Sequence, residues 1–164
     1  MNLFRSTVLL LILIITIGVR GQEQLKIKLN IELIHIANRN KKLKNCEVVI
    51  FEGNEQMYDP FTTTRNKFKK TIISKGIYKF EFSKKNYVSK HFIIDVSDIP
   101  ESKKRHSLKA EITLFKNSKK YDVSFLEKEP ISIAYYDYTK KVLKWDFDYN
   151  RSIIEKIIKA QLID

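Results

Sequence analysis

The stretch KFEFSKKNYVSKHFIIDVSDIP, residues 79–100, contains two alternating apolar runs with a polar turn between them. Alternation with a period of two places successive side chains on opposite faces of an extended chain, as in a half-buried β-strand. The apolar face that it produces here comprises Phe80, Phe82, Phe92, Ile94 and Val96, and Tyr78, just before the stretch, continues it. The pattern predicts a β-hairpin, with Tyr87 just past the turn packing back on the sheet. The basic residues around the turn are expected to be solvated; they are Lys84, Lys85, Lys90 and His91.

The same alternation recurs on both sides of the hairpin. Residues 25–33 alternate strictly, with apolar side chains at odd positions and polar ones at even positions. Further strands are expected over residues 46–51, 61–64, 67–73 and 107–115, with polar loops over 38–45 and 52–60. Strands spaced by about 8–12 residues, without helical patterns between them, are typical of sandwiches and barrels. The sequence therefore predicts an all-β protein, an antiparallel β-sandwich of about seven strands.

The C-terminal stretch RSIIEKIIKAQLID, residues 151–164, has a helical period instead. Its apolar residues form one stripe of a 3.6-residue repeat, namely Ile153, Ile154, Ile157, Ile158 and Leu162. Asp148 and Asn150 are both suitable N-cap residues. We expect an amphipathic helix over residues 150–162, which is marginal alone and whose apolar face docks on its own domain or on a partner.

The N-terminal stretch MNLFRSTVLLLILIITIGVRGQ has the order of features that a secretory signal peptide requires. Arg5 precedes an apolar run over residues 8–17, and small residues follow before Gln22. An uncleaved membrane anchor is the alternative, but a spanning helix needs about 20 apolar residues and this run is half as long. Cleavage after residue 21 would place the protein outside the cytoplasm, in the periplasm or the extracellular space of the cell envelope.

The chain is strongly basic, with a formal net charge of +12. Such an excess favours anionic partners, although a lysine-rich composition can produce it without selection for binding. Because the lysines are expected at solvated turns, any contact with acidic glycan or lipid should be weak and screened by salt. Nucleic acid is not an expected partner, since basic residues and stacking aromatics are not interleaved.

Residues that would carry catalysis are missing from the sequence. No histidine is followed three residues later by the glutamate of a zinc site, and nucleophile-elbow, P-loop and dinucleotide motifs are absent. Cys46, the one cysteine, is in phase with Val48 and Ile50 and is expected to be a small buried hydrophobe. Asp146 and Asp148 could hold Ca²⁺ but also suit a helix N-terminus. We expect no catalytic residue, no metal and no cofactor.

Aromatic residues gather before the C-terminal helix, at Tyr135, Tyr136, Tyr138, Trp145, Phe147 and Tyr149. Exposed rings could stack on sugars, whereas rings at alternating strand positions pack in the core. Packing is the expected arrangement, with Tyr136 and Trp145 as the expected exposed exceptions. The candidate ligand contacts are therefore Tyr136, Trp145, Lys84, Lys85 and Lys90.

Four segments together resemble a known family: KNCEVVIFEGNE, TTTRNKFKKTIISKGIYKFEFSKKNYVSKHFIIDVSDIPE, SLKAEITLF and YDVSFLEKEPISIAYYDYTKKVLKWDFDYNRSIIEKI. They resemble exported Bacteroidota proteins built on a carboxypeptidase-regulatory-like domain, over residues 25–160. The resemblance implies an Ig-like or prealbumin-like β-sandwich that is accessory rather than catalytic. The family favours glycine where Lys67 and Asn86 stand here, and asparagine tolerates a left-handed backbone better than lysine does.

These observations predict a non-catalytic exported module that binds or scaffolds an unknown envelope protein or glycan. The expected organisation is a signal peptide over residues 1–21, a sandwich with an aromatic-rich tail over 22–149 and a helix over 150–164. The alternatives are a carbohydrate-binding module that uses exposed aromatics, and an enzyme whose site the sequence does not reveal.

Overall fold

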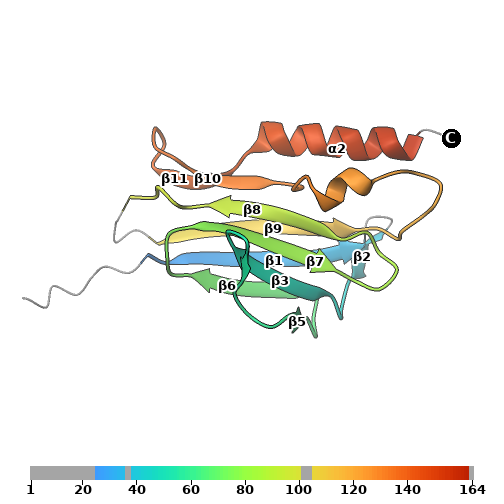
Figure 1. The fold of residues 1–164 in the computed structure, drawn as a ribbon, viewed down its shortest axis with the longest axis horizontal. Helices are drawn as coiled ribbons and strands as arrows, with labels where there is room; N and C mark the ends of the chain where they lie inside the picture. The colour runs from blue at the N-terminus through green and yellow to red at the C-terminus, as the bar shows by residue number, and fades with distance from the viewer. Residues whose placement is uncertain (1–24, 36–37, 101–104, 163–164) are drawn as a thin grey trace, which may run out of the picture.

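The computed structural model describes residues 25–35, 38–100 and 105–162. The expected signal peptide therefore lies outside the described residues. Figure 1 shows two stacked β-sheets, with helix α2 running along the side of β10 and β11. None of the described helices has the length and apolar character that crossing a membrane requires.

The first sheet is built around β1 (Ile27–His35), which follows the strict alternation of its sequence. Strand β6 (Lys67–Ile72) pairs antiparallel with β1, and so does β2 (Asn38–Lys42), which lies within the expected loop. Strand β9 (His106–Leu114) pairs with β1 in parallel. The odd-numbered side chains of β1, from Ile27 to Leu33, are buried against the second sheet.

The second sheet contains the predicted hairpin. Strands β7 (Ile77–Ser83) and β8 (Lys90–Asp95) pair antiparallel, with Phe80 opposite Phe92. The order across this sheet is β11 (Val142–Trp145), β10 (Ile133–Asp137), β8, β7, β3 (Glu47–Glu52) and β4 (Glu55–Gln56), and the short β5 (Phe61–Thr62) also pairs with β3. The β-hairpin prediction is confirmed.

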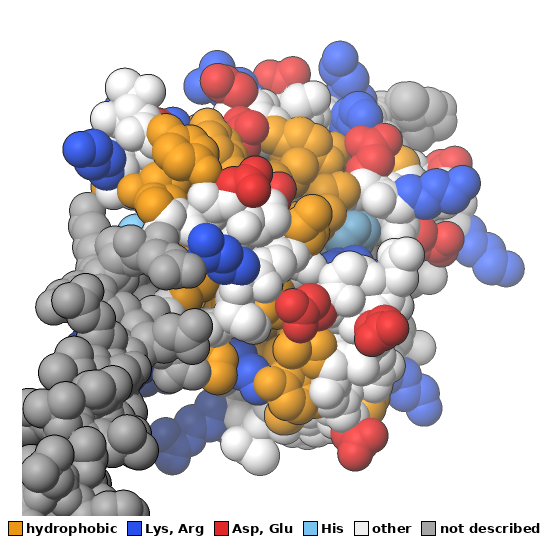
Figure 2. All heavy atoms as spheres, turned by 60° about the vertical axis from the view of Figure 1, so that its left-hand side comes forward, with side chains coloured by type: hydrophobic (Ala, Val, Ile, Leu, Met, Phe, Trp, Pro, Cys, Tyr) orange, Lys and Arg blue, Asp and Glu red, His pale blue; other side chains and the backbone are white. Residues whose placement is uncertain are grey.

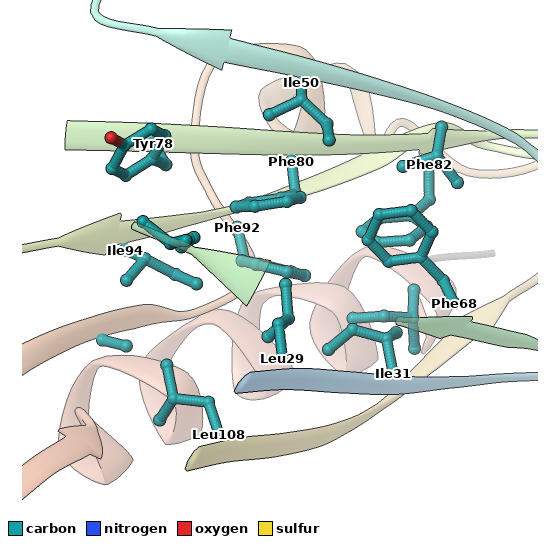
Figure 3. Packing of buried hydrophobic residues seen from close by; sticks show 14 of the residues in the cluster. Leu29, Ile31, Ile50, Phe68, Tyr78, Phe80, Phe82, Phe92, Ile94 and Leu108 are labelled. Atoms are coloured by element: carbon teal, nitrogen blue, oxygen red, sulfur yellow. The ribbon is translucent and has the colours of Figure 1, made fainter. Parts of the chain in front are cut away.

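The core between the sheets is rich in aromatic rings (Figure 3). Phe92 is fully buried, stacks on Phe80 at 5.2 Å between ring centroids, and meets Trp145 edge-on at 5.2 Å. Phe68 reaches the same cluster from the first sheet, and the centroid of its ring lies 6.0 Å from that of Phe82. Cys46 is fully buried as expected, and burial raises the pKa of its thiol.

The sandwich differs from the prediction in strand number and direction. The described residues form eleven strands rather than about seven. Two pairings are parallel, β1 with β9 and β8 with β10, so the sandwich is not purely antiparallel. Period-two alternation shows which face of a strand is buried but carries no information about the direction of its neighbour. Strands that are distant in sequence can therefore pair in parallel without a crossover helix between them.

Helix α2 (Phe147–Leu162) begins earlier than residue 150. Its N-cap is Asp146, whose Oδ1 accepts a hydrogen bond from the Tyr149 backbone N–H at 3.0 Å. Asp148 and Asn150 both lie inside the helix, so the expectation that either of them caps it is wrong. A side-chain acceptor three residues before a free N–H is the usual N-cap arrangement.

The predicted apolar stripe of α2 is divided by the fold. Ile153 and Ile157 are buried in a second, smaller core, together with Phe115, Val123 and Leu126. Ile154, Ile158 and Leu162 are exposed instead. The helix therefore docks on its own domain, as one of the two alternatives predicted, but through one edge of its stripe only. Leu126 comes from the 3₁₀ helix η1 (Ser124–Glu127).

The backbone conformation can be checked at Asn86 and Lys67, the two positions where the family that the sequence resembles favours glycine. Asn86 has a φ of 67°, the left-handed conformation that asparagine tolerates. Lys67 begins β6 and is not among the positive-φ residues of the described chain. The lysine that adopts this conformation is Lys141, with a φ of 52°, between β10 and β11.

Candidate functional site

The connection between β7 and β8 faces the segment that leads into η1 across a cleft of about 520 Å³. Both walls are mostly polar. The side chains that line the cleft include Glu81, Tyr87, Ser89, His91, Tyr121, Asp122 and Glu127. This cleft is the candidate functional site, because it is concave and converging polar groups line it.

The hairpin wall is held by the local conformation of the turn. The left-handed backbone at Asn86 closes the turn, and the Tyr87 N–H donates to the Lys84 carbonyl at 2.9 Å. The Val88 N–H donates to the carbonyl of Phe115, just past β9, at 3.0 Å. Tyr87 packs partly against the sandwich core, as expected, and also lines the cleft.

The opposite wall of the cleft is held in place by hydrogen bonds within its own segment and to β8. Asp122 Oδ1 accepts a hydrogen bond from the backbone N–H of Ser124, the first residue of η1, at 2.9 Å. Hydrogen bonds from Ser124 lower the pKa of the Asp122 carboxyl. Leu126, at 1% exposure, anchors the segment in the second core. The Ile131 N–H donates to the His91 carbonyl at 2.7 Å, which ties the end of this segment to β8.

Lys90 is buried, and the expectation that it is solvated is wrong. Only 3% of its surface is exposed, because it shares the inward face of β8 with Phe92 and Ile94. Its Nζ donates to the Thr113 carbonyl of β9 at 2.7 Å and lies 4.6 Å from the centroid of the Phe115 ring. The ammonium thus links the two sheets. Burial lowers the pKa of Lys90 to about 8, because the charged form loses its hydration.

His91 is also buried, although it points to the other face of β8. Burial and the nearby charge of Lys79 lower its pKa, against the opposing influences of Glu81 and a hydrogen bond with the Leu126 backbone. Glu81 lies directly opposite His91 in the strand register. A histidine with a lowered pKa is neutral near pH 7, so it offers hydrogen bonds to the cleft rather than positive charge.

The Lys90 environment predicts an unusual pH dependence of stability. The pKa of Lys90 is about 8 in the folded protein and 10.5 for an unperturbed lysine. Between these values the unfolded state binds more protons, so rising pH favours the folded state. From pH 7 to pH 9.5 the wild type should therefore gain about 2 kcal/mol of unfolding free energy relative to a Lys90→Met variant.

The comparison with the variant is needed because other groups oppose this trend. Burial raises the pKa of Cys46, Tyr78 and Tyr149, which lowers folding stability at high pH in both proteins. Urea titrations of both proteins at several pH values would measure the difference. A constant difference across this range would show that the Lys90 ammonium is not destabilised by burial.

Lys84 and Lys85 do not join Lys90 in one basic site. Lys84 is half-buried, and its Nζ donates to the carbonyls of Lys44 at 2.7 Å and Asn45 at 3.4 Å. Lys85 is exposed at the turn, as predicted. The three lysines that the sequence groups together thus point to three different environments. The cleft beside them is lined by acidic side chains at Glu81, Asp122 and Glu127.

The aromatic cluster also differs from expectation. Tyr136 and Trp145 are half-buried and pack against the core, so they are not the exposed exceptions. The Trp145 indole N–H donates to the Lys109 carbonyl at 2.9 Å. The exposed members are Tyr135, Tyr138 and Phe147, of which Phe147 is 70% exposed. Figure 2 shows hydrophobic side chains over the upper part of one face of the molecule, with a smaller group near the lower edge of that face.

The chemistry available to the cleft is hydrogen bonding and charge recognition. Within the described ranges, no group of three or more histidine, cysteine or acidic side chains could hold a metal ion. Asp146, one of the two Ca²⁺ candidates, caps α2. The sequence pattern did not single out Tyr121, Asp122 or Glu127, because their approach to the hairpin depends on contacts between distant segments. Glu81 could have been inferred from the predicted hairpin, whose strand pairing places it opposite His91.

Comparisons with known proteins add little to this geometry. No family model matches the chain, and no curated protein matches it. Among solved structures, it is similar to "The Bacillus anthracis TIE protein", with 20% identity and a TM-score of 0.40. That match covers 56% of this chain and 17% of the other chain, so this chain spans a small part of that protein's length.

Proposed function

We propose that this protein is a non-catalytic binding module of the cell envelope that holds a hydroxyl- or amine-bearing ligand group in the cleft beside the hairpin turn. In this proposal the N-terminal segment directs export, and the sandwich is of the Ig-like or prealbumin-like type that the family resemblance implies. The partner is an envelope protein or glycan. The cleft itself is the observation that carries the proposal.

The lining of the cleft supports this class of ligand. Phenol, hydroxyl and amide groups converge on it from Tyr87, Ser89, Asn117, Tyr121 and Ser124. Such groups donate and accept hydrogen bonds, which suits hydroxyl-rich ligands. The carboxylates of Glu81, Asp122 and Glu127 repel anions and attract amines. The lining holds these three carboxylates against one lysine, Lys90, whose Nζ donates to the Thr113 carbonyl. Glu81 also pairs with Lys79 at 3.5 Å, so Asp122 and Glu127 are the carboxylates more open to a ligand amine.

Filling the cleft tests the proposal. Ser89 is exposed and lines the cleft, so a Ser89→Trp substitution should occupy part of its volume without disturbing the core. Ser152→Trp adds the same ring on the exposed side of α2 and serves as the matched control. Binding to arrays of neutral and amino oligosaccharides and of envelope peptides should fall at least about tenfold for Ser89→Trp and stay unchanged for the control, since each 1.4 kcal/mol lost is tenfold.

Charge provides a second arm of the same experiment. Glu127→Lys should weaken binding of amine-bearing ligands more than of neutral ones, whereas Glu55→Lys, in the β3–β4 hairpin, should not. Equal binding by wild type and Ser89→Trp would show that the cleft is not the site. Turnover of any ligand during the assay would contradict a non-catalytic module and favour the enzyme alternative.

A further inference from the structure

The outer face of the first sheet carries a second polar surface, which shares no residue with the cleft. Strands β6, β1 and β9 lie side by side, and each presents every second side chain to this face. The register places Asn30 of β1 between Lys69 of β6 and Lys109 of β9. Two residues further along β1, Glu32 lies between Lys67 of β6 and Glu111 of β9.

These side chains enclose a shallow trough of about 600 Å³ that runs along β1. Asn30 and Glu32, both half-buried, form its floor, and the long side chains of the flanking strands form its walls. Neighbouring strands are about 4.8 Å apart, so the backbones that carry Lys69 and Lys109 are separated by roughly 10 Å. That width suits a single extended polymer chain.

The trough has a net positive charge, because Lys67, Lys69 and Lys109 outnumber Glu32 and Glu111 in its lining. Two exposed lysines just before it on the chain, Lys26 and Lys28, add to this charge. None of these lysines makes an ion pair with a residue in the described ranges. Glu32 Oε1 accepts a hydrogen bond from Asn66 Nδ2 at 2.6 Å. The sequence predicts the lysines at turns, whereas these lie on strands and share one face of the first sheet.

We propose that this trough binds a linear acidic polysaccharide, with its acidic groups between Lys69 and Lys109 and its hydroxyls on Asn30 and Glu32. Lysines on both walls match the anionic groups of such a chain, and the amide and carboxylate of the floor hydrogen-bond to sugar hydroxyls. Single-stranded nucleic acid fits less well, because the trough offers no exposed aromatic ring on which bases could stack. A lipid bilayer would contact the lysine tips and leave the floor unused.

Binding of a polygalacturonate oligomer tests this proposal. At 50 mM salt, a Lys69→Glu/Lys109→Glu double variant should bind at least about tenfold more weakly than the wild type, since two attractive contacts become repulsive. Lys119→Glu/Lys120→Glu makes the same change of net charge in an exposed loop and should alter binding less than twofold. Neutral dextran of equal length should not bind the trough.

Asn30→Asp provides a variant of nearly unchanged size at the floor. It should weaken polygalacturonate binding by about fivefold, because it adds one negative charge where the polymer lies closest. Thermal unfolding of every variant keeps loss of folding apart from loss of binding. Should the double variant unfold, Asn30→Asp and a Lys69→Gln variant decide the result.

The outcomes separate this surface from other sources of affinity. Equal losses in the two double variants would mean unspecific attraction by net charge and would overturn the proposal. Tighter, trough-dependent binding of anionic vesicles or of a single-stranded oligonucleotide would overturn the proposal in favour of those ligands. Failure of the wild type to bind polygalacturonate would also overturn it. The trough shares no residue with the cleft, so Ser89→Trp should leave polygalacturonate binding intact, and either site can fail alone.

Discussion

Replacing Ile153 and Ile157 together by alanine is expected to lower the free energy of unfolding by about 4 kcal/mol or more. Both side chains are buried in the second core, at 2% and 8% exposure. Truncating a buried isoleucine to alanine costs about 2–5 kcal/mol, because apolar contacts are lost and a cavity remains. The double variant should therefore unfold at much lower urea concentration, with partial detachment of α2 from the domain.

The matched control comes from the same helix. Ile154→Ala/Ile158→Ala removes the same atoms at the same spacing, but these side chains are about half exposed. Its cost should stay below about 1 kcal/mol, since surface substitutions have small effects and alanine favours helix. Urea titrations followed by circular dichroism would compare the two. Equal costs for both pairs would contradict the docked orientation of α2.

Phe92→Ala is expected to lower the free energy of unfolding by about 3–5 kcal/mol. Phe92 is fully buried and contacts the rings of Phe80, Phe82 and Trp145 at centroid distances of 5.2, 5.5 and 5.2 Å. Its loss leaves a cavity between both sheets, and neighbouring rings held in packed rotamers cannot fill it. Thermal and urea unfolding would measure the change.

Two further substitutions define the origin of that cost. Phe92→Leu keeps an apolar side chain at the site and should recover most of the loss, since volume governs the cavity. Ile93→Ala, at the next position of β8, removes a half-buried side chain on the outer face and should cost less than Phe92→Ala. A larger cost for Ile93→Ala would mean that the strand faces are reversed.

Local pattern was sufficient where burial follows from alternation. The hairpin of β7 and β8, the two faces of β1 and the burial of Cys46 agree with the period-two pattern. The existence of α2 agrees with its 3.6-residue period. The same parity already placed Lys90 on the face of Phe92, but its nearness to a lysine-rich turn suggested solvent. Strand parity was the better guide, because side-chain direction is determined by backbone geometry and not by neighbouring composition.

Other features depend on which distant segments meet. The parallel pairing of β9 with β1, the burial of His91 near η1 and the burial of only one edge of the α2 stripe all come from contacts across the chain. The cleft joins residues 81–91 to residues 117–127, and the trough joins β6, β1 and β9. A single sequence reports the periodicity of each segment, which determines its local structure and its buried face. Only the tertiary structure determined the neighbours of that face, because pairing partners are selected by the packing of the whole core.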